Sequence, residues 1–203
     1  MKDANYYFSV RPVSSDGTTI SSDWSVAGGP YALPRLLENM SRLMPPRLLA
    51  KKQTPALCPP LLDGKVAGFS VLTEMSSRDT ASVLSGKVVL LYFSAKWCGP
   101  CRQFTPRLAD FYHSAKPTKG SKFEIVFVSC DHDEDEMMDY YEHHPWTAIP
   151  YNDEKRSQLM AAFGVRGIPQ LTCILPNTKI AAQNATQSIS ESQLDSWIKE
   201  AGL

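Results

Sequence analysis

Along the last two thirds of the chain, the spacing of hydrophobic and polar residues alternates between the pattern of strands and the pattern of helices. This alternation predicts alternating strands and helices. Unbroken apolar runs at 87–94 ("KVVLLYFS") and 123–130 ("FEIVFVSC") have the length of strands and are rich in β-branched and aromatic residues. Runs of this kind are typical of strands buried on both faces of a sheet. A further strand is predicted at 170–175 ("QLTCIL"), and 179–183 is expected to pair back with it after a turn at 176–178.

Helical spacing separates these strands. Apolar residues recur at helical intervals after residue 100, and further helices are predicted at 133–144, at 154–163 and from Ser190 onward. The segment 133–144 opens with acidic residues and closes with histidines, a charge order that favours the helix dipole. The resulting order is strand, helix, strand, helix, helix, strand, strand, helix. It predicts an α/β fold with a central mixed β-sheet flanked by helices on both faces.

The N-terminal part of the chain differs in composition and in periodicity. It is rich in Ser, Gly and Pro and shows little periodicity, so we predict an irregular extension over 1–61 and one folded domain over 62–203. The domain is expected to open with an edge strand at 68–72 and a short helix at 76–84. Within the extension, 40–52 ("MSRLMPPRLLAKK") has four basic residues and no acid. We interpret it as a basic linker, with a mitochondrial presequence as the alternative if translation begins at its first methionine.

The overall composition is that of an ordinary globular domain. Of 203 residues, 43% are hydrophobic and 21% are charged, which provides enough apolar material for a core. The formal net charge is zero, so nothing indicates nucleic acid or acidic lipid as a partner. No apolar run approaches the roughly 20 residues of a membrane-spanning helix. Five cysteines are too few for a disulfide scaffold and suggest a reducing compartment, so we expect a cytoplasmic protein.

Two cysteines carry the candidate chemistry. Cys98 and Cys101 stand in "KWCGPCR", between the first buried strand and the next helix, where sites gather in open α/β sheets. The free N–H groups and partial positive charge of a helix's first turn lower the pKa of a thiol, which predicts Cys98 as the nucleophile. Cys101, one turn further, is then the resolving thiol. Gly99 permits close approach by a partner's backbone, and Pro100 stiffens the turn without removing a needed N–H.

Other interpretations of this cysteine pair are weaker. A structural zinc site needs a second Cys/His pair, and none stands at suitable spacing. A purely structural disulfide across two residues stabilises little, because the loop that it closes is so short. A hydrolase with a single reactive cysteine lacks its organised Cys/His/Asn pattern. The acidic run at 131–136 lacks the glycine and spacing of a calcium loop. Cys130 and Cys173 lie in apolar runs and are expected to be inert core thiols.

Several segments of the chain resemble one protein family. "WCGPC" after an apolar strand, followed by "GIP" at 167–169 before another strand, resembles the thioredoxin superfamily. The runs at 91–106, 123–131 and 145–151 are similar to its tryparedoxin and nucleoredoxin branch. The resemblance extends over roughly 62–203 and implies a thioredoxin fold.

Two positions depart from what the family shows. The tryparedoxin branch typically carries Cys-Pro-Pro-Cys, whereas this chain has Gly99 in place of the first proline, which leaves the physiological reductant open. Ordinary thioredoxins keep a buried aspartate six residues before the first cysteine, and here that position is Tyr92. Proton handling at Cys101 must then depend on water or another group.

The resemblance also implies an activity. It indicates a thiol-disulfide oxidoreductase that reduces the disulfides of proteins such as peroxiredoxins. Pro169 is expected to be a cis-proline facing the dithiol, with the backbone of Ile168 as the edge for a substrate peptide. Trp97 is expected to form an exposed apolar lip for docking. No bound cofactor is implied, and the electrons come from trypanothione, glutathione or a flavin enzyme such as thioredoxin reductase.

A second hypothesis belongs to a different class of function. The chain is then a redox-inactive thioredoxin-fold binding module, anchored in a larger assembly by its N-terminal extension. The length of the extension favours this hypothesis, whereas the intact dithiol and the "GIP" segment favour the enzyme, which we expect to be a monomer. An oxidase or isomerase is a further alternative within the enzyme class.

Overall fold

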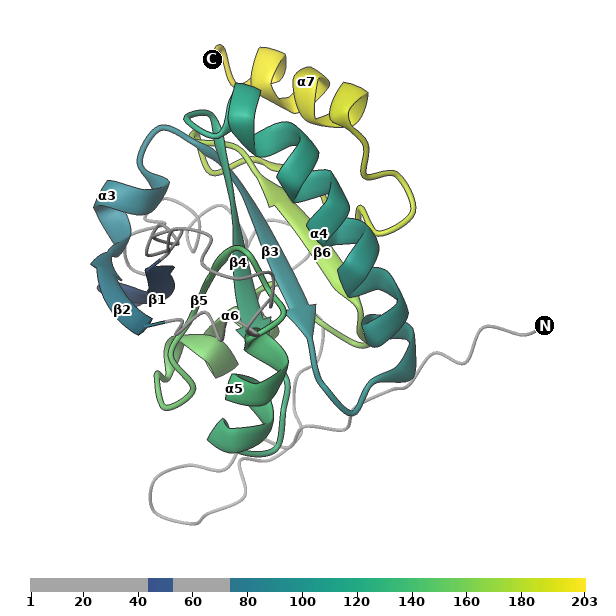
Figure 1. The fold of residues 1–203 in the computed structure, drawn as a ribbon. Helices are drawn as coiled ribbons and strands as arrows, with labels where there is room; N and C mark the ends of the chain where they lie inside the picture. The colour runs from purple at the N-terminus through teal and green to yellow at the C-terminus, as the bar shows by residue number, and fades with distance from the viewer. Residues whose placement is uncertain (1–43, 53–73) are drawn as a thin grey trace, which may run out of the picture.

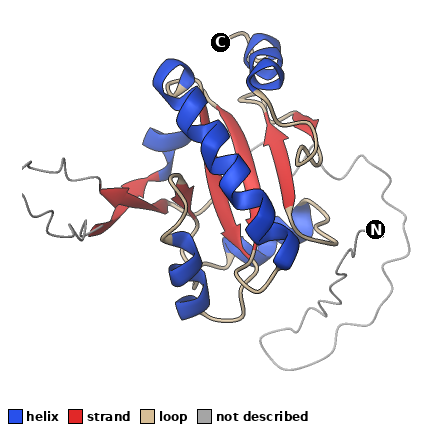
Figure 2. Cartoon of the chain, turned by 45° about the vertical axis from the view of Figure 1, so that its right-hand side comes forward, coloured by secondary structure: helices blue, strands red, loops and turns tan. Residues whose placement is uncertain are grey.

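The computed structural model describes residues 44–52 and 74–203, which form one mixed sheet flanked by helices (Figures 1 and 2). The strand order across the sheet is β2-β1-β5-β4-β3-β6-β7. The strands are β1 (Arg47–Lys52), β2 (Glu74–Asp79), β3 (Val88–Ser94), β4 (Phe123–Ser129), β5 (Thr147–Ala148), β6 (Gln170–Ile174) and β7 (Ile180–Ala182). The helices are α3 (Thr80–Leu84), α4 (Gly99–Lys119), α5 (Glu134–Tyr141), α6 (Lys155–Ala162) and α7 (Glu191–Glu200). The predicted α/β class and mixed sheet are confirmed.

The central strand β3 organises both cores. It runs parallel to β4 and antiparallel to β6, and all residues of β3 and β4 are buried. Its side chains alternate between the two faces, so Leu90 joins one apolar cluster and Leu91 the other. Helices α4, α5 and α7 cover the Leu90 face, and α3 and α6 cover the Leu91 face. Burial on both faces explains the unbroken apolar sequence of these strands.

Residues 47–52 were predicted to be irregular, and this prediction was wrong because they form strand β1. They pair antiparallel with β2 from Arg47↔Asp79 to Lys52↔Glu74, and Leu49 pairs with Ala148 of β5. Leu48 is completely buried. The basic and proline-rich surroundings concealed a short strand whose stability comes from distant pairing partners rather than from local propensity.

The end of β2 and the start of α3 differ in part from prediction. Residues 76–79 end strand β2 rather than begin a helix, and α3 starts only at Thr80. Asp79 caps it by accepting a hydrogen bond from the Ser82 amide. The strand predicted at 68–72, Cys58 and most of the 1–61 extension lie outside the described residues. None of the helices in the described part of the chain has the length and apolar content of a membrane-spanning segment.

Candidate functional site

The two cysteines of the "WCGPC" segment meet at the start of α4. Cys98 is the N-cap of this helix and forms a disulfide with Cys101, with 5.2 Å between the two Cα atoms. The backbone N–H of Cys101 donates a hydrogen bond to Sγ of Cys98 at 3.2 Å. After reduction, negative charge on Cys98 therefore faces a helix amide and the positive end of the α4 dipole. Both cysteines are buried in the disulfide form, Cys101 completely and Cys98 with 1% exposed.

A segment far along the chain completes this region. Strand β6 pairs with β3 in the register Phe93↔Gln170, which brings the residues before Gln170 to the carboxyl end of β3. The Ile168–Pro169 peptide bond is cis, as expected. The carbonyl oxygen of Ile168 lies 3.7 Å from Sγ of Cys98. The structure therefore places the "GIP" segment directly beside the disulfide.

The residues around the disulfide differ in exposure. Pro100 is exposed and Gly99 is half-buried. Trp97 is also half-buried, and its Nε1 donates to the carbonyl of Cys130 at 3.2 Å. Its ring centroid lies 5.5 Å from that of His132. Trp97 is thus held against the loop after β4, with part of its ring left at the surface.

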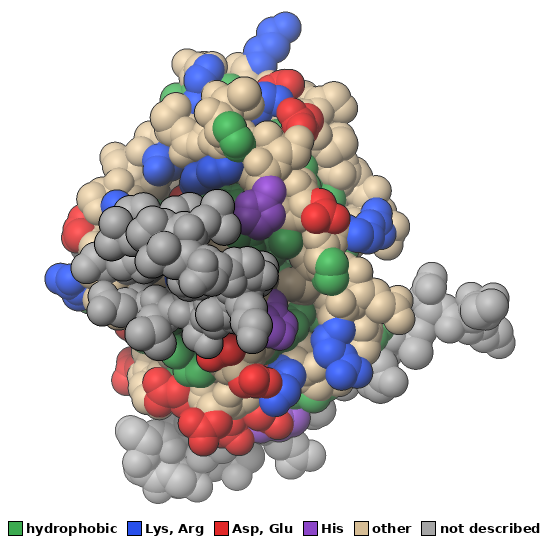
Figure 3. Space-filling model, in the orientation of Figure 1, with side chains coloured by type: hydrophobic (Ala, Val, Ile, Leu, Met, Phe, Trp, Pro, Cys, Tyr) green, Lys and Arg blue, Asp and Glu red, His purple; other side chains and the backbone are tan. Residues whose placement is uncertain are grey.

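Asp131 fixes the loop that carries the nucleophile, a role that the sequence did not suggest. This carboxylate is buried and accepts hydrogen bonds from the Lys96 amide at 2.6 Å and from the Ser129 hydroxyl at 2.7 Å. Burial raises the pKa of Asp131. The neighbouring acids serve α5 instead, where Asp133 caps the helix, and acidic side chains gather around this end in Figure 3. Among the described residues, no group of His, Cys, Asp and Glu is arranged to hold a metal ion.

A cluster of four buried hydroxyl groups lies beneath Cys101. Thr105 donates to the carbonyl of Cys101 at 3.0 Å and shares a further hydrogen bond of 2.8 Å with Tyr92. Ser94 bonds to the hydroxyls of both Tyr92 and Tyr140, at 3.0 Å and 3.1 Å, and Thr105 also meets Tyr140. Burial raises the pKa of Tyr92, so its hydroxyl stays protonated. The position that holds aspartate in ordinary thioredoxins here supports the backbone of Cys101 through neutral hydrogen bonds.

The histidines expected to favour the end of α5 behave differently from prediction. The helix ends at Tyr141, and His144 is 1% exposed in a cluster of aromatic rings. Burial lowers the pKa of His144 to about 3, so the imidazole is neutral. Neither ring nitrogen has a hydrogen-bond partner in the described structure. Lys51 of β1 supplies the positive charge instead, because its Nζ donates to the carbonyls of Glu142 and His144 at 2.6 Å and 2.9 Å.

The other two described cysteines are in apolar surroundings. Burial raises the pKa of Cys130 to about 12 and also raises the pKa of Cys173. Sγ of Cys130 lies 3.9 Å from the sulfur of Met160, and Cys173 is completely buried in β6. Both are therefore poor nucleophiles, as expected, but only Cys173 is a core thiol, because Cys130 is half-buried in the loop after β4.

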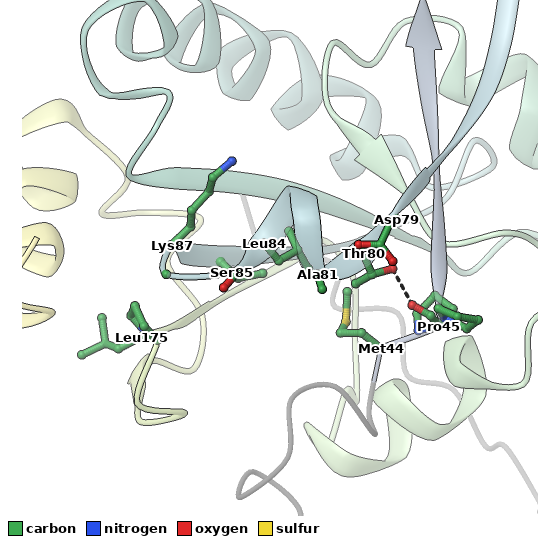
Figure 4. A pocket seen from close by; sticks show the side chains of 13 residues that line it. Met44, Pro45, Asp79, Thr80, Ala81, Leu84, Ser85, Lys87 and Leu175 are labelled. Atoms are coloured by element: carbon green, nitrogen blue, oxygen red, sulfur yellow. Dashed lines mark hydrogen bonds between the residues drawn. The ribbon is translucent and has the colours of Figure 1, made fainter.

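Two cavities lie at opposite ends of the central strands. A polar groove of about 770 Å³ begins at Pro100, Ile168 and Pro169, beside the disulfide. An apolar cavity of about 380 Å³ lies at the other end, near the start of β3 (Figure 4). Met44 and Leu84 line this second cavity, which contains no cysteine or histidine.

The fold and the site together define a class of protein. A disulfide-forming Cys-x-x-Cys pair at the start of α4, beside a cis-proline at the start of β6, is the arrangement of a thioredoxin-fold dithiol protein. The model of the thioredoxin-like family matches residues 86–180. The tryparedoxin of Trypanosoma brucei brucei is 41% identical over 127 residues, which cover 61% of this chain and 87% of that protein. The chain belongs to the thioredoxin-like family, with tryparedoxins and nucleoredoxins as its relatives.

Solved structures give the same assignment. The structure of tryparedoxin from Trypanosoma brucei shares 39% identity with a TM-score of 0.53, covering 58% of this chain and 81% of that one. A tryparedoxin II in complex with glutathionylspermidine shares 31% identity with a TM-score of 0.53, covering 60% of this chain and 83% of that one.

Nucleoredoxins are matched over a smaller part of their length. The nucleoredoxin of Danio rerio is 48% identical over 108 residues, which cover 53% of this chain and 26% of that protein. For the nucleoredoxin of Xenopus laevis the identity is 40%, and the match covers 57% of this chain and 28% of that protein. The chain thus spans about a quarter of the length of these relatives.

Proposed function

We propose that this chain is a thiol-disulfide oxidoreductase that reduces protein disulfides through Cys98 and Cys101. The observation that carries the proposal is the position of the Cys98 sulfur, at the N-cap of α4 and within hydrogen-bond reach of the Cys101 amide. This environment stabilises a thiolate more than the thiol and lowers the energy of the attacking form.

The reaction consists of two exchanges. The Cys98 thiolate attacks one sulfur of a substrate disulfide, forms a mixed disulfide and releases the other substrate sulfur as a thiolate. The Cys101 thiolate then attacks Sγ of Cys98, which frees the second substrate thiolate and leaves the Cys98–Cys101 disulfide seen here. Two protons complete the two product thiols. A donor dithiol, or two molecules of a monothiol, returns two electrons to Cys98 and Cys101 and is itself oxidised to a disulfide.

The neighbouring residues have substrate-binding roles in this proposal. The backbone of Ile168 pairs with an extended peptide beside Cys98, and Pro169 holds this edge in place. Trp97 and Pro100 offer apolar contact at the surface, while Gly99 leaves space for the partner's backbone. Peroxiredoxins are the protein substrates to test first. The relative solved with glutathionylspermidine supports a low-molecular-weight thiol as the electron donor.

The structure also bears on the basic segment at 40–52. If this segment were removed as a presequence, the protein would lose β1 and the buried side chain of Leu48. We therefore propose that the segment is retained and that the protein is cytoplasmic. N-terminal sequencing of the native protein tests this, since a start after Lys52 contradicts it.

The decisive experiment measures reduction of insulin and of an oxidised peroxiredoxin with three donors: trypanothione, glutathione, and NADPH with thioredoxin reductase. We expect turnover with at least one donor, loss of turnover to background in Cys98→Ser, and accumulation of a mixed disulfide in Cys101→Ser. Cys173→Ala is the control and retains activity. A wild-type protein that is inactive with every donor contradicts the proposal and favours a binding module.

A further inference from the structure

The groove beside the disulfide is lined by charged side chains of one sign, the positive one. Its walls come from α4, from the loop between α6 and β6, and from the residues after β7. Among the described residues, the only charged side chains that line it are Arg107 of α4 and Arg166 of the α6–β6 loop. No carboxylate from 44–52 or 74–203 lines the groove, although the chain as a whole has a formal net charge of zero. An unbalanced positive potential therefore lies next to the reacting sulfurs.

Both arginines are available to a ligand. They are exposed, and neither forms a hydrogen bond or ion pair with another residue in 44–52 or 74–203. Lys96, which also lies near the disulfide, is different because Asp139 pairs with its ammonium group at 2.6 Å. Within the described residues, the unpaired positive charge near the disulfide is thus carried by the two groove arginines and by Arg102, which does not line the groove.

The amide side chains in the groove divide into two kinds. Three are held by the walls: Gln170 donates to the Thr172 hydroxyl, Gln183 donates to the Phe163 carbonyl, and Asn184 accepts from the Leu171 and Thr186 amides. Gln103 and Gln187 are exposed and form no hydrogen bond within the described residues. Two guanidinium groups and two unpaired amide side chains that line the same groove are donors for the oxygen atoms of carboxylates.

We infer that this groove binds carboxylate side chains of the substrate protein, so that disulfides flanked by acidic residues are reduced preferentially. The inference rests on the proposed function and specifies its substrate class. A peptide paired to the Ile168 backbone beside Cys98 continues along Pro169 into the groove, where Arg107 and Arg166 meet its side chains. A substrate with positive charges next to its disulfide is repelled by the same two arginines.

The test uses three synthetic peptides that share one intramolecular disulfide and carry two flanking Glu, Gln or Lys residues. Exposed ion pairs are individually weak and are screened by salt, so we expect kcat/KM to be about 3- to 10-fold higher for the Glu peptide than for the Gln peptide at low salt. The Lys peptide is slowest, and the differences shrink as salt is added.

Variants locate the effect in the groove. In Arg107→Gln/Arg166→Gln, the ratio of kcat/KM for the Glu and Gln peptides falls to about one, and Arg166→Glu shifts the preference toward the Lys peptide. Arg102→Gln is the matched control, since Arg102 is exposed and close to the disulfide but does not line the groove. It keeps the wild-type ratio.

The outcomes separate this inference from the proposed function. Equal kcat/KM values for the three peptides overturn the inference while leaving the reductase intact. Failure to reduce any peptide contradicts the proposed function itself. If oxidised glutathione is reduced in an arginine-dependent way while the peptides show no charge preference, the groove serves a small thiol and the inference is wrong.

Discussion

The two ends of β3 belong to one rigid, buried strand, but they differ in chemistry. At the carboxyl end the strand meets the start of α4, the hydroxyl cluster and the polar groove. At the amino end, near Lys87, lies an apolar cavity bordered by the start of β1 and by α3. Both ends are hollowed, yet only one combines a nucleophile, helix amides and an entry for a peptide. The comparison teaches that a cavity becomes a candidate site through the groups that converge on it rather than through its shape.

The largest effect that we expect is on thiol reactivity, and it tests the special character of the carboxyl end of β3. In the reduced protein at pH 7, Cys98 should react with iodoacetamide at least ~100-fold faster than Cys130, whose pKa of about 12 leaves almost no thiolate. Both residues lie near the carboxyl ends of β3 and β4, so the difference combines the thiolate stabilisation at the start of α4 with the burial that raises the pKa of Cys130. Peptide mass spectrometry over a time course measures both rates. Equal rates would remove the basis for Cys98 as the nucleophile.

A large effect on stability, without an effect on chemistry, is expected for Leu48→Ala. Leu48 is completely buried in the same apolar cluster as Met44 and Leu84, which line the apolar cavity. The substitution should lower the free energy of unfolding by about 2–5 kcal/mol. The alkylation rate of Cys98 in the folded protein should be unchanged. Urea unfolding provides the measurement, with the half-buried Leu49→Ala as the milder control.

Acid should destabilise the protein through His144. The pKa of this histidine is lowered from its ordinary 6.5 to about 3, so between these values the unfolded chain binds a proton that the folded chain excludes. The contribution of neutral His144 to the free energy of unfolding is therefore present in full well above pH 6.5. It is lost as the pH decreases, by about 2–3 kcal/mol at pH 4.5. Burial is the main cause, and the charges of Lys51 and His143 add to it.

The comparison of variants isolates this effect of His144. His144→Leu should lose part of the decrease in unfolding free energy between pH 7 and pH 4.5. The control is His143→Gln at the exposed neighbour, which should keep most of the wild-type pH dependence because burial, and not the charge of His143, is the main cause of the low His144 pKa. An unchanged decrease in His144→Leu would show that other groups account for the acid sensitivity.

The smallest effect is expected at the hydroxyl cluster. Tyr140→Phe removes the hydrogen bonds to Ser94 and Thr105, while Tyr92 and Thr105 remain paired, so it should cost about 1 kcal/mol of stability. Because Thr105 supports the backbone of Cys101, release of the mixed disulfide should slow by roughly fivefold at most, the factor that corresponds to 1 kcal/mol.

Stopped-flow measurement of product release tests this expectation for Tyr140. Tyr112→Phe is the matched control, since it loses a buried hydrogen bond to Glu124 away from the disulfide. It should reduce stability without slowing release. Equal slowing in the two variants would mean that the cluster has no specific relation to Cys101.

The parts of the structure that were predictable are those with strong local patterns. The apolar runs of β3, β4 and β6 and the helix start at Cys98 were expected from residues close together in sequence. The cis-proline at Pro169 was expected from the resemblance to the thioredoxin superfamily. The features that were not predicted depend on distant contacts. Strand β1 requires the pairing partners in β2 and β5, and Asp131 binds the Lys96 amide across two loops.

The other differences between prediction and structure come from the burial of a side chain and from residues distant in sequence that line one groove. His144 stands in a polar stretch that suggested a charged helix end, and only the surrounding aromatic rings make it neutral. Arg107 and Arg166 are 59 positions apart in sequence and meet in one groove because α4 and the α6–β6 loop lie side by side there. No local pattern in the sequence contains this information.

The two-stranded ribbon of β1 and β2 has a consequence for the solubility of the domain. The free edge of a sheet is a template for pairing with another molecule, and short β5 would offer such an edge if β1 were missing. Among the strands that the structure describes, the outermost is instead β2, which carries the charged residues Arg78 and Asp79. The ribbon thus places a charged border where self-association would otherwise begin, and a recombinant fragment that starts at residue 62 should be prone to aggregate.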